Sequence, residues 1–251
     1  MAGAGTLRTI GASHTLVYPA RPMNPSIRGI SSMATRALLA ELATAYHAHA
    51  GVEVAIESVG GVDAARRVAA GEPFDVAVLA ADAIDRLAAA GHVIADSRTG
   101  VVRSDVAIAV RAGAPHPDIG SADALRHALL AARTIGYSTG PSGTALLQLL
   151  ERWGIAEALR ERIVQAPPGV PVGTLVARGD VELGFQQRSE LMHLDGVDVL
   201  GGMPAGIEIV TVFAGAVCAA STRPGDARAL LDFLASPATD DAKRRHGMQP
   251  A

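Results

Sequence analysis

The chain has little cysteine, few aromatic side chains and no long apolar run. Its one cysteine, Cys218, stands in the apolar segment 210–220, so a disulfide within the chain and a metal site of the CxxC type are both excluded. A lone cysteine in such surroundings is typical of a small buried hydrophobic residue. Every apolar run is shorter than the roughly 18–20 residues that a membrane-spanning helix needs, so we expect no insertion into a membrane.

Positive charge is not in excess either. The 251 residues carry 22 Lys and Arg against 25 Asp and Glu, a formal net charge of −3, which argues against a nucleic-acid partner. The eight histidines show no spacing typical of a metal site. Neither a dinucleotide-binding glycine pattern nor a P-loop is present, so we expect no metal and no cofactor.

Small aliphatic residues are what the chain has in quantity. Hydrophobic residues make up 49% of the sequence, aromatic residues only 3%, and Ala, Val, Leu and Gly dominate. Such a composition favours a core of helices packed on parallel strands. A chain of this length accommodates one large domain or two lobes.

The first 25 residues differ from the rest. They hold three prolines, several turn formers and no clear period, so we expect an N-terminal extension over 1–25. They lack the continuous apolar stretch of a secretory signal peptide, which predicts a cytoplasmic chain as the sequence is written. Met23 and Met33 are alternative starts, and a different N-terminus would allow a periplasmic location.

From residue 26 onward, strand and helix patterns alternate. Strand patterns fall at 26–31, 52–58, 74–81, 105–113 and 134–138, and each is followed by a segment of helical period. Further units cover 173–187 and 206–220, and one or two helices close the chain at 226–247. This repetition predicts an α/β fold with parallel sheets covered on both faces.

Capping residues mark the ends of several predicted helices. Gly51 and Gly91 follow helical segments as stops. Asp82 and Ser121 stand where two helices are expected to begin, and their side chains are suitable caps.

Four junctions between a predicted strand and the next helix are rich in small and hydroxyl residues. They contain Ser31 and Ser32; Gly60 and Gly61; Ser138, Thr139, Ser142 and Gly143; and Val172 with Gly173. A helix N-terminus leaves four N–H groups unpaired and carries about half a positive charge. Several such ends together can bind an anion without Lys or Arg.

Each junction also has a simpler interpretation, because Ser, Thr and Gly are common helix caps. A separate polar cluster, Gln186, Gln187 and Glu190, follows the apolar segment 181–185 where a strand is expected to end. Glutamine side chains can donate to a carboxylate or an oxyanion. Exposed polarity after a strand accounts for the cluster equally well, so the sequence leaves both alternatives open.

The order of these segments resembles the type II periplasmic solute-binding proteins, nearest to the molybdate-binding group. The resemblance runs from about residue 26 to the C-terminus, and its most specific stretches are "AARRVAAGEPFDVAVLAAD" (64–82), "TLVARGDVELGF" (174–185) and "ALLDFLASPATDDAKRRHGMQP" (229–250). It implies two α/β lobes with a ligand cleft between them. The first lobe would comprise 26–103 plus 222–251, and the second 104–221.

The resemblance also implies a set of ligand-binding residues. The family holds tetrahedral oxyanions with hydroxyls and with backbone N–H groups at helix starts. By position, Ser31 or Ser32 corresponds to the first ligand serine, and Val172 lies near a backbone donor of the second lobe.

This chain departs from the molybdate binders at three places. Gly60 and Gly61 stand where those proteins usually carry serines, and Gln187 stands where they place a tyrosine. The hydroxyls of Ser138, Thr139 and Ser142 occur where the family's loop differs. A small di- or tricarboxylate fits a cleft rich in Gln and Ser at least as well as molybdate.

Two functions from different classes stay open. The first, which we favour, is a binding protein that captures a small anion, a molybdate-type oxyanion or an organic carboxylate, by hinge closure, as for an ABC importer with a permease as its partner. The second follows from a resemblance to the solute-binding-like proteins that include aconitate isomerase. It implies an enzyme that moves a proton within an unsaturated polycarboxylate, for which Glu190 is a candidate general base. A cytosolic binding or sensing role is a third, less specific option.

Overall fold

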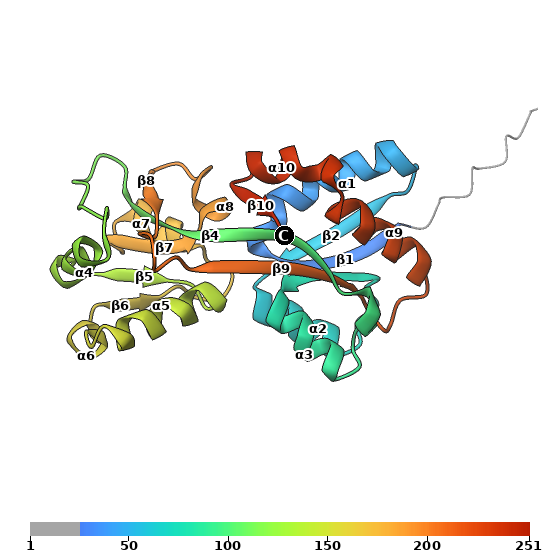
Figure 1. The fold of residues 1–251 in the computed structure, drawn as a ribbon, viewed down its shortest axis with the longest axis horizontal. Helices are drawn as coiled ribbons and strands as arrows, with labels where there is room; N and C mark the ends of the chain where they lie inside the picture. The colour runs from blue at the N-terminus through green and yellow to red at the C-terminus, as the bar shows by residue number, and fades with distance from the viewer. Residues whose placement is uncertain (1–25) are drawn as a thin grey trace, which may run out of the picture.

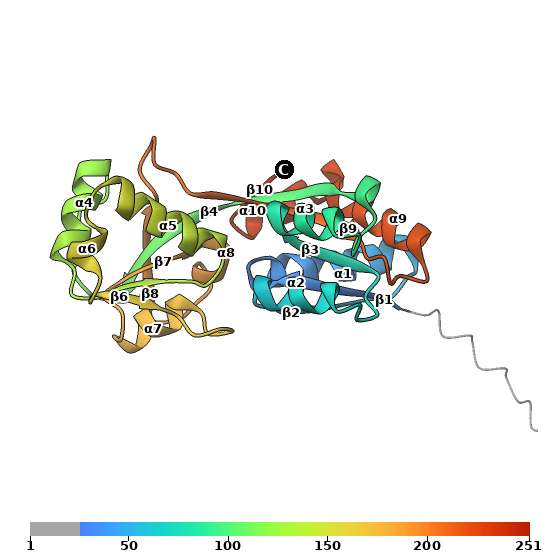
Figure 2. The same cartoon turned by 90° about the horizontal axis from the view of Figure 1, so that it is seen from below.

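The computed structural model describes residues 26–251, and the expectations for 1–25 lie outside the described residues. Two α/β lobes lie side by side along the longest axis of the molecule, and strands β4 and β9 run between them (Figure 1 and Figure 2). None of the helices within residues 26–251 combines the length and apolarity needed to cross a membrane.

The sheet of the first lobe has a parallel centre. Strand β1 (Ile27–Ser32) pairs with β2 (Val54–Val59) on one side and with β3 (Val76–Ala80) on the other. All five residues of β3 are buried, as expected for a strand that is covered on both faces. Antiparallel β9 (Val210–Val217) pairs with β3, β4 (Thr99–Arg111) pairs with β9, and β10 (Met248–Pro250) pairs with β4.

Helices cover both faces of this sheet. One face carries α1 (Arg36–Ala50), α9 (Pro224–Ala235) and α10 (Asp240–Arg245), and the other carries α2 (Gly61–Ala69) and α3 (Ala81–Ala89). Short 3-10 turns lie at Met33–Thr35 (η1), Ala95–Ser97 (η2) and Pro237–Thr239 (η3).

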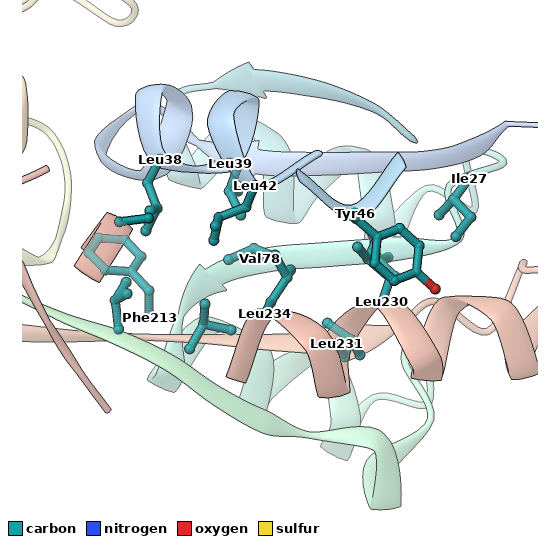
Figure 3. Packing of buried hydrophobic residues seen from close by; sticks show 14 of the residues in the cluster. Ile27, Leu38, Leu39, Leu42, Tyr46, Val78, Phe213, Leu230, Leu231 and Leu234 are labelled. Atoms are coloured by element: carbon teal, nitrogen blue, oxygen red, sulfur yellow. The ribbon is translucent and has the colours of Figure 1, made fainter. Parts of the chain in front are cut away.

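The core under α1 shows why its sequence forms a helix at this place. Leu38, Leu42 and Tyr46 recur every four residues, so they share one helical face. That face packs against α9, with Leu230 and Leu234 opposite (Figure 3). Each of these leucines is almost fully buried, which stabilises the fold by roughly 2 kcal/mol per side chain.

The second lobe repeats the layered arrangement. Strand β5 (Ile135–Tyr137) lies parallel to β6 (Ile163–Gln165) and β7 (Leu183–Gln187), and β8 (Val197–Gly202) pairs with β4. Its helices are α4 (Ala122–Ala131), α5 (Pro141–Arg152), α6 (Ala156–Leu159), α7 (Val172–Arg178) and α8 (Arg188–Leu191). One cluster of buried residues lies beneath α4, α5 and α6, and smaller clusters lie beneath α7 and α8.

Strand β4 belongs to both lobes. From Thr99 to Asp105 it pairs with β9, and from Val106 onward it pairs with β7 and β8. Strand β9 pairs with β3 from Phe213 to Val217 and with β4 from Val210 to Gly215.

The expectation of parallel sheets is right only for the centre of each lobe. The strands that run between the lobes reverse direction, and β9 and β4 pair antiparallel with every neighbour they have. The physical reason is that β4 carries the chain from the first lobe to the second and β9 carries it back, so the two strands run in opposite directions.

The capping predictions have mixed outcomes. Gly51 ends α1 in the left-handed conformation at φ 69°, and the Ser121 hydroxyl accepts the Ala124 N–H at 3.1 Å at the start of α4, so both are confirmed. The prediction for Asp82 is wrong. The N-cap of helix α3 is Ala80, two residues before Asp82, and the Asp82 carboxylate pairs with Arg86 at 2.8 Å one turn further along.

Candidate functional site

A cleft of about 330 Å³ lies between the two lobes. The first lobe lines it with η1, with the starts of α2 and α3, and with Phe213 of β9. The second lobe lines it with the loop into α5, the loop into α7, the end of β7 and Glu190 of α8. Seven of the predicted site residues lie in this lining: Ser32, Gly60, Gly61, Ser138, Thr139, Ser142 and Gln187.

Three helices of eight or more residues begin at the cleft, and no side chain caps any of them. Their N-cap residues are Gly60 for α2, Ala80 for α3 and Gly140 for α5. None of the three has a side chain that can accept a hydrogen bond from the first turn. The first-turn N–H groups of α2 and α3 are therefore left to another acceptor at the cleft. In α5, Pro141 has no N–H and the Gly143 N–H donates to the Gly140 carbonyl oxygen at 3.0 Å, so the Ser142 N–H is the one that α5 offers there.

The hydroxyls beside these helices do not act as caps. Ser32 precedes η1 without a side-chain cap bond, and the Ser138 and Ser142 hydroxyls are bonded to each other at 3.0 Å. By contrast Ser121, on α4 and outside the cleft lining, makes the ordinary capping bond. The hydroxyls at the cleft are thus donors that a ligand can use.

Three other predicted site residues lie outside the lining. Ser31 is fully buried in β1 and its hydroxyl contacts that of Ser58 at 2.8 Å. Val172 is the first residue of α7 and is fully buried. Gly143 lets α5 approach the preceding loop, because a Cβ at this position would lie only 1.9 Å from the carbonyl oxygen of Ser138.

Gln187 brings a buried amide to the cleft. The side chain is 4% exposed, its Nε2 donates to Thr211 Oγ1 at 2.7 Å, and its Oε1 has no hydrogen-bond partner within residues 26–251. If the amide is rotated by 180°, its oxygen accepts from the Thr211 hydroxyl, because a hydroxyl can both donate and accept. The NH₂ group then takes the position of the oxygen that has no partner. A buried polar atom without a protein partner at the edge of a cleft can be satisfied there by water or by a ligand.

Glu190 is held by a chain of two hydrogen bonds. The backbone N–H of Gly173 donates to Gln186 Oε1 at 3.0 Å, and Gln186 Nε2 donates to Glu190 Oε1 at 2.9 Å. Burial raises the pKa of Glu190 to about 7, and the Gln186 hydrogen bond opposes part of that rise. The carboxyl therefore changes charge near neutral pH.

Charge in the lining is sparse. Within the described residues, the cleft contains one cationic and one anionic side chain, Arg86 and Glu190. Arg86 is 72% exposed and paired with Asp82, so it stands at the mouth rather than the floor. No group of three or more His, Cys, Asp or Glu within residues 26–251 is placed to hold a metal ion.

One hydrogen bond joins the lobes beside the cleft. Ser189 of α8 donates to the carbonyl oxygen of Ala34 in η1 at 2.9 Å. The bond connects the element that carries Glu190 to the start of the first-lobe lining.

Arg86 and Phe213 are cleft residues that the sequence does not predict. Arg86 lies four residues after Asp82 on a helix, a spacing that indicates an exposed ion pair rather than a ligand. Phe213 belongs to an alternating strand, where an aromatic side chain is ordinary core. Neither position carries a local signal of ligand binding.

The comparisons with known proteins agree on the family. A model described as bacterial extracellular solute-binding protein matches residues 27–249. An aconitate isomerase from Pseudomonas sp. is 36% identical over 242 residues, which cover 94% of this chain and 92% of that enzyme.

Solved structures show the same fold at lower identity. The periplasmic molybdate-binding protein of Azotobacter vinelandii superposes with a TM-score of 0.74 at 20% identity, covering 89% of this chain and 98% of that one. The sulfate-binding protein of Mycobacterium tuberculosis H37Rv superposes with a TM-score of 0.75 at 21% identity, covering 90% and 87%. These likenesses confirm the predicted two-lobed α/β fold.

Proposed function

Because this chain belongs to the family of bacterial extracellular solute-binding proteins, we propose that its cleft captures a small di- or tricarboxylate between the two lobes. The observation that carries this proposal is the convergence of three uncapped helix starts on one cleft. The starts of α2 and α3 present unpaired N–H groups to this space, α5 adds the Ser142 N–H, and all three bring a partial positive charge. The buried, half-satisfied amide of Gln187 is a second and independent sign of a ligand.

Three observations favour a carboxylate over a tetrahedral oxyanion. The cleft volume of about 330 Å³ lies in the range of sites for organic ligands. The curated relative at 36% identity is named for aconitate, whereas the molybdate- and sulfate-binding structures are 20% and 21% identical. The amide of Gln187 adds a planar hydrogen-bonding group that suits a flat carboxylate.

In this role the partner of the chain is a membrane permease. Two of the solved structures with a similar fold are named as a molybdate-binding and a sulfate-binding protein. Delivery of a solute to an ABC importer requires the chain on the outer side of the membrane, so the proposal includes a periplasmic location for the transport role.

A thermal-shift panel tests the proposal. Molybdate, tungstate, sulfate, citrate, cis-aconitate and trans-aconitate are added separately at millimolar concentration. A ligand at 100 times its Kd adds about 2.7 kcal/mol to the free energy of unfolding, which is a clear rise in midpoint. We expect the polycarboxylates to raise the midpoint most. A rise with molybdate and tungstate alone would overturn the choice of a carboxylate.

A second candidate function rests on Glu190. The relative at 36% identity is named aconitate isomerase, and a carboxyl with a pKa of about 7 in the cleft suits a general base. In an allylic isomerisation, Glu190 removes a proton from the methylene next to the double bond. The double bond then moves by one carbon, and the same proton returns to the far carbon, so nothing is consumed.

Ultraviolet absorbance of cis- and trans-aconitate follows this activity directly. The second function predicts interconversion by the purified chain, and loss of turnover in Glu190→Gln with binding retained. Binding of aconitate without any turnover would leave the chain a binding protein.

A further inference from the structure

The carboxyl of Glu190 faces the space where the anion is proposed to bind. Glu190 lines the cleft together with the starts of α2, α3 and α5, and its side chain is only partly exposed. A carboxylate at this place repels a second carboxylate, whereas a neutral carboxyl donates a hydrogen bond to it. The protonation state of Glu190 therefore decides whether it opposes or supports the ligand.

The hydrogen bonds of Glu190 engage one of its carboxyl oxygens and leave the other without a partner in residues 26–251. Gly173 can only donate, so Oε1 of Gln186 must lie on its side and the Gln186 NH₂ group must point at Glu190. Oε1 of Glu190 accepts that N–H at 2.9 Å, and no described residue bonds to the other carboxyl oxygen, Oε2. A proton on Oε2 therefore has no acceptor within the described part of the chain, and a ligand supplies one.

No charged group competes for that proton. The cation that shares the lining is Arg86, which is already paired with Asp82. On the element of Glu190 itself, the Arg188 guanidinium lies near Gly202, and His193, just beyond α8, packs its ring edge against His246.

The helices and strands packed on α8 place no charged side chain against Glu190 within the described residues. Strand β7 and η1 carry no ionisable side chain. The ionisable residues on β4, β8 and α7 are Arg103, Asp105, Arg111, Asp198 and Arg178. Arg103, Asp105, Arg111 and Arg178 are exposed, Asp198 bonds to His116 and to the backbone of Gly113, and no charged residue shifts the pKa of Glu190.

We propose that the cleft binds its anion together with one proton, which is held between Oε2 of Glu190 and an acceptor oxygen of the ligand. This inference rests on the proposed capture of a small anion in the same cleft. It extends that function, because it makes the proton a second ligand and makes the affinity depend on pH. The recognised species is an ionised carboxylate plus a proton from solvent, or equally an anion that arrives carrying that proton.

The linkage has a definite size and sign. Burial places the pKa of Glu190 at about 7 before the ligand enters. Uptake is then ~1 proton per anion above about pH 8, about half a proton at pH 7 and close to none below about pH 6. The Kd rises about tenfold for each pH unit above 7 and levels off below 6.

The two candidate functions require opposite states of this carboxyl. Capture with a proton needs Glu190 neutral in the complex, whereas allylic isomerisation needs it ionised at the start of each turnover. Affinity that falls with rising pH supports the first, and a turnover rate that rises with pH through about 7 supports the second.

Isothermal titration calorimetry on the full chain tests the inference. Citrate, trans-aconitate and sulfate are titrated at pH 8 in HEPES, triethanolamine and Tris, whose ionisation enthalpies differ. The slope of binding enthalpy against buffer enthalpy gives the number of protons taken up. Sulfate carries no proton at this pH, so uptake with sulfate assigns the proton to the protein rather than to the ligand.

The matched variants are Glu190→Gln and Glu161→Gln. Glutamine at position 190 donates at every pH, so it is expected to bind without proton uptake and with a Kd independent of pH. Glu161 is an exposed carboxyl of the second lobe outside the cleft lining, and its variant is expected to behave as the parent chain. If Glu190→Gln does not fold, the pH dependence of the Kd and the proton uptake of the parent chain still test the inference.

Each outcome has one meaning. Uptake near one proton that disappears in Glu190→Gln supports the inference. Binding with zero uptake in all three buffers overturns it and leaves the proposed capture of an anion intact. Absence of binding for all three anions overturns both.

Discussion

The Ser189 hydroxyl in the second lobe donates a 2.9 Å hydrogen bond to the Ala34 carbonyl oxygen in the first. The bond lies beside the cleft, next in sequence to Glu190 on one side and to the η1 lining residues on the other. A contact of this kind holds the lobes in the arrangement in which their two halves of the site face one ligand.

Removal of that bond is expected to weaken ligand binding. In Ser189→Ala, loss of one neutral hydrogen bond makes closure less favourable by ~0.5–1.5 kcal/mol, so the Kd rises about 2- to 10-fold. Calorimetric titration measures the change. Ser236→Ala is the matched control, because the Ser236 hydroxyl makes a similar 2.8 Å bond to the Phe233 carbonyl oxygen within one lobe. An equal loss of affinity in both variants would show that Ser189 contributes only to general stability.

The hydroxyls of the α5 junction are expected to affect affinity rather than stability. Ser142→Ala removes no cap bond but loses the hydrogen bond to Ser138, so the free energy of unfolding falls by only ~0.5 kcal/mol while the Kd for the preferred anion rises severalfold. Ser121→Ala removes a real cap and lowers the free energy of unfolding by ~1 kcal/mol without a change in Kd. Urea unfolding and calorimetry on both variants measure the two quantities. The opposite pattern would make Ser142 a purely structural residue.

The glycine at 143 is expected to be required for packing. In Gly143→Ala, the new Cβ meets the Ser138 carbonyl oxygen, so the loop 138–142 must move and the fold loses ~1–3 kcal/mol. The displaced loop also lowers affinity, because it lines the cleft. Gly225→Ala is the control, since a Cβ there meets nothing within 4 Å, and its unfolding midpoint should not fall. An unchanged midpoint in Gly143→Ala would contradict the packing role.

Glu190 is expected to make the unliganded protein less stable at high pH. Its pKa is raised from 4.5 to about 7, so the folded state binds the proton more tightly than the unfolded state. This stabilisation is complete below about pH 4.5 and is lost as the pH rises through about 7, a change of about 3 kcal/mol. Urea unfolding of the parent chain and of Glu190→Gln at pH 5 and pH 8 measures the contribution of Glu190 to the free energy of unfolding.

The comparison of the two proteins is necessary because other carboxyls act in the opposite sense. Hydrogen bonds from His246 lower the pKa of Glu41, those from Arg133 lower that of Glu182, and the Gly113 N–H lowers that of Asp198. Their stabilisation is lost as the pH falls. Parallel pH profiles for the parent chain and Glu190→Gln would mean that the carboxyl is ionised in the folded state throughout.

The parts of this structure that the sequence predicts are those with a local cause. Helix α1 repeats apolar residues every four positions and stops at a left-handed glycine, so its extent follows from neighbours in the chain. The α5 junction is predicted as a ligand loop because hydroxyls and glycines cluster within a few residues. The nearness of Ser32 and Gly61, about 30 residues apart, follows from a pattern of wider range: two successive strand–helix units predict that β1 and β2 pair in parallel.

Features that depend on distant partners are not predicted in this way. Arg86 becomes a cleft residue only because α3 begins at the same edge as α2, and its own sequence indicates an ordinary ion pair. The sequence does single out Gln186 and Glu190. Their hydrogen bonds depend on Gly173, thirteen residues before Gln186, and no pattern within either segment predicts that contact. The antiparallel pairing of β9 is likewise set by a partner more than 100 residues away.

Strand β4 has a consequence for how this molecule melts. It gives Val101 and Val102 to the core of the first lobe, and Val106, Ile108 and Val110 to the core of the second. Unravelling either lobe therefore strips a strand from the other, so the lobes unfold cooperatively rather than one after the other. A scanning calorimeter should record one heat-absorption peak, and an anion that touches only the cleft should raise the melting temperature of the whole described chain.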